Sequence, residues 1–187
     1  MHFPLLHGPW PDTLWTIGHS TLAAGEFVGR LRAHRLQAIA DVRRFPGSRR
    51  HPHFSSEAMP QWLGEAGIGY AWLPQLGGRR RPVPGTPNTA WRNDSFRGYA
   101  DHLQSAEFAE GMAALQQFAL AQRTALMCAE TLWWRCHRAL ICDVLKVHGV
   151  QVLHVGAAEA ETAHPYTSAA TVSDGELSYG GAQPGLF

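Results

Sequence analysis

The sequence predicts an α/β fold, in which a mostly parallel central sheet of about five strands carries helices on both faces in a three-layer, Rossmann-like arrangement. Short, β-prone apolar runs alternate along the chain with segments of helical periodicity. The length of 187 residues and the hydrophobic fraction of 45% suit one domain with a buried core. Small and polar residues dominate from Ala157 onward, so we expect a single α/β domain at residues 1–156 and a flexible C-terminal tail at 157–187.

The first part of the chain contains two strands and a helix between them. An apolar run at residues 13–20 ends in Gly-His-Ser and predicts a strand. Residues 22–36 then place apolar side chains on one helical stripe, with Ser20 or Thr21 available as the N-cap. The run at residues 37–43 predicts the next strand. This order is typical of a parallel crossover.

The middle of the chain continues the alternation and then interrupts it. A short helix is expected at residues 55–67, where Pro60 lies near enough to the start to be tolerated, and a third strand at 68–74. Residues 74–93 contain four prolines, three glycines and four arginines without hydrophobic periodicity, so they predict a loop. Helical spacing returns at residues 96–103.

The second half of the chain repeats the helix and strand pattern. Residues 106–122 are periodic over a longer helix, and the apolar run at 124–130 predicts a buried strand. From Arg138 the periodicity is again helical and it stops at Gly149, a residue type that commonly follows a helix C-terminus. Residues 150–156 predict the last strand.

Composition gives no sign of a charged partner for the chain as a whole. Charged residues make up 17% of the sequence and the formal net charge is +1, so overall charge indicates neither nucleic acid nor a membrane surface. With three cysteines, no recognisable signal segment and no apolar run of membrane-spanning length, we expect a reduced, cytoplasmic protein that does not bind a membrane. Electrostatic recognition must then be local.

Polar side chains gather where the predicted strands end. In a parallel sheet these ends meet at one edge, where helix N-termini also point and where ligands bind. The expected site consists of residues that follow the first, second and fourth strands and of the start of the next helix: His19, Ser20, Asp41, Arg43, Arg44, Cys128, Glu130, Cys136, His137 and Arg138. Their convergence is more specific than any single motif among them.

Four of these residues are expected to act as catalytic acids or bases: Asp41, Glu130, His19 and His137. Structural roles are the alternatives. Asp41 can cap a turn or pair with an arginine. Glu130 can be a buried partner of Arg138, and His137 can simply hydrogen-bond at the start of the helix.

Two cysteines lie near the expected helix start. A thiol there, beside Arg135 and Arg138, would have a lowered pKa and would suit a nucleophile. The phosphatase loop is absent, because Arg135 follows Cys128 one residue too late and tryptophans occupy the cradle positions. Cys128, Cys136 and the nearby histidines form no recognised zinc set, so we expect no metal and no cofactor. Both thiols are expected to line a substrate pocket, with packing as the alternative for Cys128.

Two loops carry a local excess of positive charge. The segments DVRRFPGSRRHPHF and LGGRRRP hold seven arginines and two histidines, and acids are scarce in both. Arginine forks grip phosphate oxygens, and aromatic side chains stack on bases. We expect a phosphate-bearing ligand, a nucleotide or nucleic acid, and among its contacts Arg43, Arg44, Arg79, Arg138 and Trp133. The alternative is a solvated loop whose arginines pair with acids elsewhere.

The chain ends in GAQPGLF, in which Gln183 precedes Leu186 and Phe187. This peptide looks like the short motif by which bacterial repair and replication proteins dock on the sliding clamp. Gln183 would hydrogen-bond at the mouth of the clamp pocket while Leu186 and Phe187 fill an apolar slot. The sliding clamp is therefore an expected partner.

Several short motifs occur in a fixed order: TIGHS, DVRRFPGSRR, LGG, FRGYADHL, and CAE followed by CHR. With these motifs the chain resembles the bacterial and archaeal family known as Domain of Unknown Function 488, over roughly residues 13–155. The family motifs coincide with the expected strand-end site. The resemblance thus implies where a site lies and implies no activity, because the family name records none.

We expect a hydrolytic enzyme that acts on a nucleotide or nucleic acid, with Asp41 or Glu130 activating water and arginines holding phosphate. Cleavage of a glycosidic bond to a base fits best, since it needs one carboxylate to direct water and stabilise a cationic sugar. Phosphodiester cleavage usually needs a metal and a denser acid cluster. The alternatives are a non-catalytic module that binds a nucleotide or modified base, and thiol chemistry at Cys136.

Overall fold

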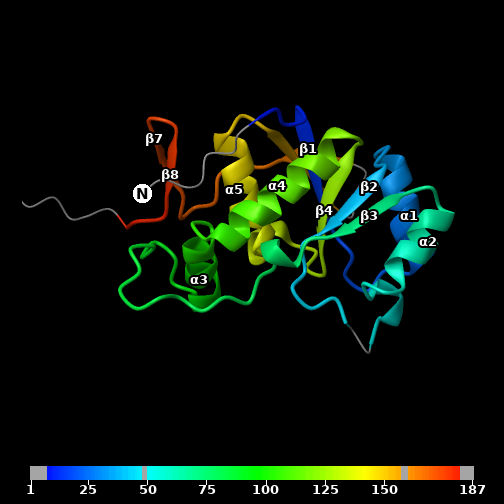
Figure 1. The fold of residues 1–187 in the computed structure, drawn as a ribbon, viewed down its shortest axis with the longest axis horizontal. Coiled ribbons are helices and arrows are strands. Elements are labelled where there is room, and N and C mark those ends of the chain that lie inside the picture. Colours follow the sequence, from blue (N-terminus) through cyan, green and yellow to red (C-terminus); the bar gives the residue numbers. More distant parts are fainter. Residues whose placement is uncertain (1–7, 48–49, 157–159, 182–187) are drawn as a thin grey trace, which may run out of the picture.

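The computed structural model describes residues 8–47, 50–156 and 160–181. The strands of its main sheet are β1 (Thr13–Gly18), β2 (Ala38–Asp41), β3 (Gly69–Trp72), β4 (Thr124–Cys128), β5 (Gln151–Val155) and β6 (Glu161–Ala163). They lie in the order β3-β2-β4-β1-β5-β6 (Figure 1). The first five strands are parallel, and β6 pairs antiparallel with β5. β1 and β4 are therefore neighbours at the centre of the sheet.

Helices cover both faces of this sheet (Figure 1). The α-helices are α1 (Ala24–Ala33), α2 (Met59–Glu65), α3 (Asp94–His102), α4 (Ala106–Leu120) and α5 (Arg138–Val147), and the short 3-10 helices are η1 (Pro52–Phe54), η2 (Pro74–Leu76) and η3 (Trp133–Arg135). The predicted three-layer α/β class is confirmed. Within the described ranges, no helix combines the length and the apolar character that a bilayer crossing requires.

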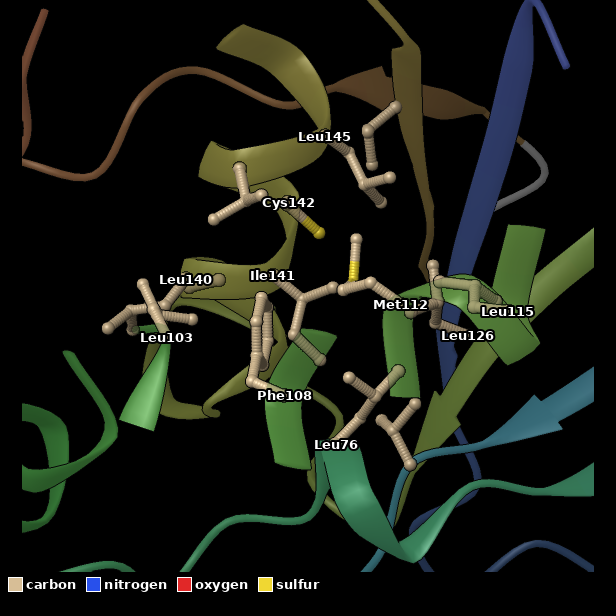
Figure 2. Close-up of a cluster of buried hydrophobic side chains, with 14 of the residues drawn as sticks. Leu76, Leu103, Phe108, Met112, Leu115, Leu126, Leu140, Ile141, Cys142 and Leu145 are labelled. Atoms are coloured by element: carbon tan, nitrogen blue, oxygen red, sulfur yellow. The ribbon is translucent and has the colours of Figure 1, made fainter. Parts of the chain in front are cut away.

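The alternation of side chains along each strand divides the core into two clusters. On β1, Trp15 and Ile17 belong to the cluster under α1 and α2, whereas Leu14 belongs to the cluster under α4 and α5. Met112 of α4 and Ile141 of α5 are among the side chains that fill the second cluster (Figure 2). Burial of each such side chain contributes about 2 kcal/mol. The two clusters fix the helices to the sheet and so fix the loops at its carboxyl edge.

The start of α1 differs from the prediction. Neither Ser20 nor Thr21 is the N-cap residue. That position is Ala23, whose backbone N–H donates to the Glu26 carboxylate at 2.9 Å. Ser20 has a φ of +47° and its N–H pairs with the Ala129 carbonyl, so it belongs to the loop that joins β1 to the helix.

The expectation of a flexible tail does not hold for residues 160–181. β6 adds an antiparallel edge strand to the main sheet. Leu177 and Tyr179 are buried against the domain, with exposed fractions of 2% and 0%. A second, two-stranded antiparallel sheet is formed by β7 (Thr171–Ser173) and β8 (Glu176–Ser178).

Hydrogen bonds to Asp143 explain why this polar segment packs. Asp143 lies in α5, is fully buried, and so requires donors inside the protein. His164, Thr167 and Tyr179 all donate to its carboxylate, at 2.6 to 2.9 Å. These bonds hold the segment in place together with the packing of Leu177 and Tyr179 against the hydrophobic core.

Candidate functional site

A cavity of about 950 Å³ lies at the carboxyl edge of the parallel strands. Its wall comes from the loops after β1, β2 and β4, from the loop after η2, and from the first residues of α3 and the segment before α5. The charged or reactive side chains on the wall are Arg43, Arg50, Arg79, Arg135, Glu130, Cys128, Cys136, His19, His51 and His137. Ser20, one of the expected contacts, also lines the cavity.

The C-terminal end of β1 packs closely against the loop that follows β4. The backbone N–H of His19 donates to the Cys128 carbonyl at 3.0 Å. A Cβ at Gly18 would lie only 2.1 Å from the carbonyl oxygen of Glu130, so no other residue type fits without moving the backbone. Glycine at this position therefore lets residues far apart in the chain share one wall of the cavity.

Arg43 is held in one orientation by three neighbours. Its Nε and Nη2 donate to the Asp41 carboxylate at 2.8 and 2.5 Å, its Nη1 pairs with Nε2 of His19 at 3.0 Å, and Nη2 also contacts the Met59 sulfur at 3.3 Å. Burial works against the charge, but the Asp41 carboxylate outweighs it and raises the pKa of the guanidinium. These contacts use four of the five N–H donors of an arginine. The fifth, on Nη1, has no partner among the described residues.

Asp41 does not reach the cavity, contrary to its expected role as a catalytic acid or base. It is fully buried, and besides Arg43 it accepts a hydrogen bond from the Tyr70 hydroxyl at 2.8 Å. Burial and the Asp41 charge raise the pKa of Tyr70, so this hydroxyl remains a donor. A carboxylate with both oxygens engaged in this way cannot direct a water molecule. It orients Arg43 instead.

His19 lines the cavity with both ring nitrogens engaged. Nδ1 donates to the Ser20 carbonyl at 2.9 Å, which leaves Nε2 to accept from Arg43. Burial and the Arg43 charge lower the pKa of His19 to about 4, so the ring is neutral near pH 7. It also stacks on Phe54, with ring centroids 4.0 Å apart. The structure thus places His19 as a support for Arg43 and leaves it no nitrogen for proton transfer.

Glu130 is the expected acid or base that does line the cavity. Its Oε1 accepts the backbone N–H of Leu132 at 3.1 Å, which fixes the carboxylate. Oε2 makes no hydrogen bond to the described part of the chain. Arg138 bonds to the main-chain carbonyl of Glu130, not to the carboxylate, so the two do not form the buried pair considered from the sequence.

Cys128, Cys136 and His137 form a compact cluster on the same wall. His137 donates Nε2–H to the Val42 carbonyl at 2.9 Å, and its Nδ1 lies 3.6 Å from the Cys136 sulfur. A hydrogen bond from the Cys128 thiol, together with His137 and Arg138, lowers the pKa of Cys136 well below its usual value despite burial. The same hydrogen bond, together with burial, raises the pKa of Cys128.

Arg138 lies beneath the cavity and not on its wall, which corrects its expected role in substrate binding. Its side chain is 1% exposed. Nε donates to the Cys136 sulfur at 3.4 Å, Nη1 to the Thr16 hydroxyl at 3.3 Å, and Nη2 to the Glu130 carbonyl at 2.5 Å. Its donors are used inside the protein, where they join the loop after β4 to the first turn of α5.

Two other expected contacts lie away from the main cavity. Trp133 stacks on His154, with ring centroids 4.4 Å apart and planes 4° from parallel, and it packs against His164. It is half-buried against the core, with His154 covering one face of its ring, and it does not line the main cavity. Arg44 lines a smaller adjoining pocket of about 190 Å³, together with Arg79.

The loop arginines divide between the cavity and the surface. Arg79 is exposed on the cavity rim with a φ of +59°, and Arg50 and Arg135 also line the wall. The adjacent Arg80 instead pairs with Glu107 at 2.7 Å outside the cavity, as the solvated-loop alternative anticipated. Nothing in the run of three arginines distinguishes these neighbours, since their roles depend on the turn between them.

Ser95 and Phe96 line the cavity although no chemical motif marks them. They belong to the first turn of α3, where the Asn93 side chain accepts the backbone N–H groups of both residues, at 2.9 and 3.3 Å. This N-cap is the one sequence signal for the turn. The sequence does not show that this turn faces the strand ends, because its position depends on how the preceding loop folds.

The proposed clamp-binding residues Gln183, Leu186 and Phe187 lie outside the described residues.

The family model described as Domain of unknown function DUF488 matches residues 23–145. This range begins at the residue before α1 and ends within α5, and it contains the cavity residues that follow β2 and β4. No curated protein and no solved structure matches the chain. The family description names no reaction.

Proposed function

The chain belongs to the DUF488 family, and we propose that it is a hydrolase that acts on a phosphate-bearing nucleotide or nucleic acid, with cleavage of a glycosidic bond to a base as the reaction. The observation that carries this proposal is the composition of one cavity wall, which among the described residues contains four arginines and a single carboxylate. Arginines recognise phosphate oxygens, and a positioned carboxylate can act as the general base that activates water.

Arg43 supplies the preorganised part of the phosphate site. Asp41 and His19 fix its plane, so a phosphate that binds the remaining Nη1 donor does not have to immobilise a flexible side chain. Arg79 and Arg135, both exposed, add positive charge on the rim. A fixed arginine on the wall and exposed arginines on the rim suit a ligand that enters from solvent.

Glu130 supplies the catalytic carboxylate. Among the described residues it is the one acid on the cavity wall, and the Leu132 N–H fixes one of its oxygens. The other oxygen would direct water to the anomeric carbon and stabilise the cationic sugar of the transition state. Phe45, which is 67% exposed, and Phe96 line the same cavity and would stack on a displaced base.

Base release from DNA tests the reaction. Duplex oligonucleotides that each carry one modified or mismatched base are incubated with the protein, and free base is measured by mass spectrometry. We expect release from at least one duplex, and a rate lower by about 10² to 10⁴ in Glu130→Gln, the usual range for loss of a general acid or base. Glu110→Gln, an exposed α4 residue outside the cavity, is the matched control and should retain the wild-type rate.

Binding to the same oligonucleotides separates catalysis from recognition. Glu130→Gln should bind with nearly wild-type affinity, because it keeps the shape of the side chain, whereas Arg43→Lys should bind at least about tenfold more weakly, since lysine cannot reproduce the arginine fork. Undiminished base release by Glu130→Gln would contradict the mechanism. Tight binding without release of any base would identify a non-catalytic nucleotide-binding module.

A further inference from the structure

Cys128, Cys136 and His137 place three metal-ligating atoms around one point on the cavity wall. The two sulfurs and Nδ1 of the imidazole lie within 4.8 Å of one another. We propose that these residues bind a zinc ion whose fourth coordination position opens into the cavity. The end of β4 provides the first ligand and the residues just before α5 provide the other two.

The spacing of the ligand atoms suits zinc. In a tetrahedral site with Zn–S of about 2.3 Å and Zn–N of about 2.0 to 2.1 Å, a sulfur and a nitrogen lie about 3.5 to 3.6 Å apart. The observed distance from the Cys136 sulfur to Nδ1 of His137 is 3.6 Å. Two thiolates and one imidazole are donors that zinc prefers, whereas magnesium and calcium take oxygen ligands.

The ring of His137 is fixed in the orientation that a ligand needs. Its Nε2–H donates to the Val42 carbonyl at 2.9 Å, so the lone pair is on Nδ1, the atom that faces the sulfur. Gly78 leaves space beside this atom, because a Cβ there would lie 2.8 Å from Nδ1. Gly78 is not among the glycines with positive φ, so space and not backbone conformation favours glycine at this position.

Arg138 holds the Cys136 sulfur from the side opposite the cavity. Its Nε donates to this sulfur at 3.4 Å, and its other donors are bound by Thr16 and by the Glu130 carbonyl. Hydrogen bonds of this kind orient a metal ligand and tune its charge. The sulfur therefore has a fixed direction although it lies at the edge of an open cavity.

The open position gives the ion a role in hydrolysis. Zinc with three protein ligands keeps one position for water and makes that water a stronger nucleophile. Glu130 follows Cys128 by two residues and lines the same cavity. Zinc deaminases combine a His/Cys/Cys ion with a glutamate that is not a ligand. The role of Glu130 in directing a zinc-bound water rests on the proposed function. The zinc site itself does not depend on that function.

Metal content tests the site directly. The full chain is purified under anaerobic, reducing conditions, treated with a chelator, incubated with zinc chloride and separated by gel filtration, and zinc is then measured by mass spectrometry. We expect about one zinc ion per chain. Cys128→Ser, Cys136→Ser and His137→Gln should each bind at least about tenfold more weakly. Cys142→Ala and His148→Gln, which change the same residue types outside the cluster, should retain zinc.

Cobalt provides a readout that needs no variant, in case a substitution prevents folding. The wild-type chain loaded with Co²⁺ should show thiolate-to-cobalt charge-transfer absorption and the visible bands of a tetrahedral ion. The proposal is overturned if the reduced wild-type chain retains neither zinc nor cobalt, or if Cys128→Ser and His137→Gln retain as much zinc as wild type. Neither measurement uses a nucleic-acid substrate, so its failure is distinct from a failure of the proposed hydrolysis.

Discussion

Asp41 and Asp143 are both fully buried carboxylates, but they are compensated in different ways. Asp41 forms a direct ion pair with Arg43 next to the cavity. Asp143, on the far side of the same domain core, accepts hydrogen bonds from the backbone N–H and hydroxyl of Thr167 at 3.0 and 2.6 Å and from the Tyr179 hydroxyl at 2.8 Å. Asp41 orients the charge of Arg43, and Asp143 accepts hydrogen bonds from several residues of the C-terminal segment.

A series of hydrogen bonds links Asp143 to Arg138 at the start of the same helix. His164 donates to Asp143 at 2.9 Å and accepts from His154 at 2.9 Å. The other nitrogen of His154 accepts from the Thr16 hydroxyl at 2.7 Å, and Thr16 accepts in turn from Arg138. Every group donates in the same direction, so the bonds polarise one another between the two buried charges. Burial and the neighbouring His164 and Arg138 lower the pKa of His154 to about 3, which keeps it neutral.

This difference shows two uses of a buried acid. The direct pair fixes one arginine at the cavity and involves residues close in sequence. The linked series fastens residues 160–181 onto α5 and reaches Arg138 beneath the thiol cluster. We therefore expect Asp143 to contribute more to stability and Asp41 to contribute more to ligand binding.

Removal of Asp143 should have the largest effect on stability. Asp143→Ala leaves several buried donors without an acceptor, each at a cost of about 1–3 kcal/mol, so we expect the free energy of unfolding to fall by about 4 kcal/mol. Urea unfolding monitored by tryptophan fluorescence measures it. Asp12→Ala, an exposed residue, is the control. If Asp143→Ala lowers the free energy of unfolding by less than Asp41→Asn does, the expectation that Asp143 contributes more to stability is wrong.

Asp41→Asn should lower stability less and binding more. Loss of the carboxylate leaves Arg43 with an unpaired charge, but the cavity admits water to it, so we expect a loss of about 3 kcal/mol in the free energy of unfolding. Arg43 should also lose its fixed orientation. The affinity for a 5′-mononucleotide, measured by calorimetry, should fall by about tenfold, or about 1.4 kcal/mol. Unchanged affinity would show that Asp41 does not position Arg43.

Acid should weaken the Asp143 network through His154. Its pKa is about 3 in the folded protein and 6.5 in the reference state, so between these values the unfolded chain binds a proton that the native state does not. Stability is therefore fully present above about pH 6.5 and falls as the pH drops toward 3, by at most about 1.4 kcal/mol per pH unit for this group. Urea unfolding at several pH values should show a shallower slope for His154→Gln than for wild type.

Tyr179→Phe should have the smallest effect. It removes one hydrogen bond to Asp143 and keeps the buried ring, so the free energy of unfolding should fall by about 1 kcal/mol. Tyr166→Phe, at a half-buried ring near Lys146, is the matched control and should be nearly neutral. If Tyr179→Phe is equally neutral, the hydroxyl does not fasten the C-terminal segment.

The sheet and its helices could be predicted because their sequence pattern reflects which side chains are buried. Strand runs such as 124–128 and the periodic stripe of α4 have this property. Residues 160–181 lack such a pattern, because hydrogen bonds to Asp143 and a few scattered apolar residues such as Leu177 hold them. A polar residue within α5 gives no indication that it is the acceptor for a segment twenty or more residues away.

The location of the candidate site followed from topology, whereas the roles of its residues did not. Parallel strand ends meet at one edge, which is how Glu130, Cys128 and Cys136 come to line one cavity. Asp41 occupies an equivalent strand end and yet faces inward. Alternation along β2 does not settle this, because the pairing with Arg43 depends on the turn that follows the strand.

Gly18 sets a limit on how this protein can change. Even a methyl group at this position would clash with the Glu130 carbonyl. The backbone of the loop after β4, which carries Cys128 and Glu130, would then have to move. The arginine-rich loop after β2 is less restricted, since a Cβ at Gly47 would meet nothing within 4 Å, whereas Gly77 and Gly78 of the other arginine-rich loop are closely packed. We therefore expect ligand preference to diverge through residues at the cavity rim, while Gly18 and the loop packed against it stay unchanged. Variant libraries designed for new specificities should change only rim residues.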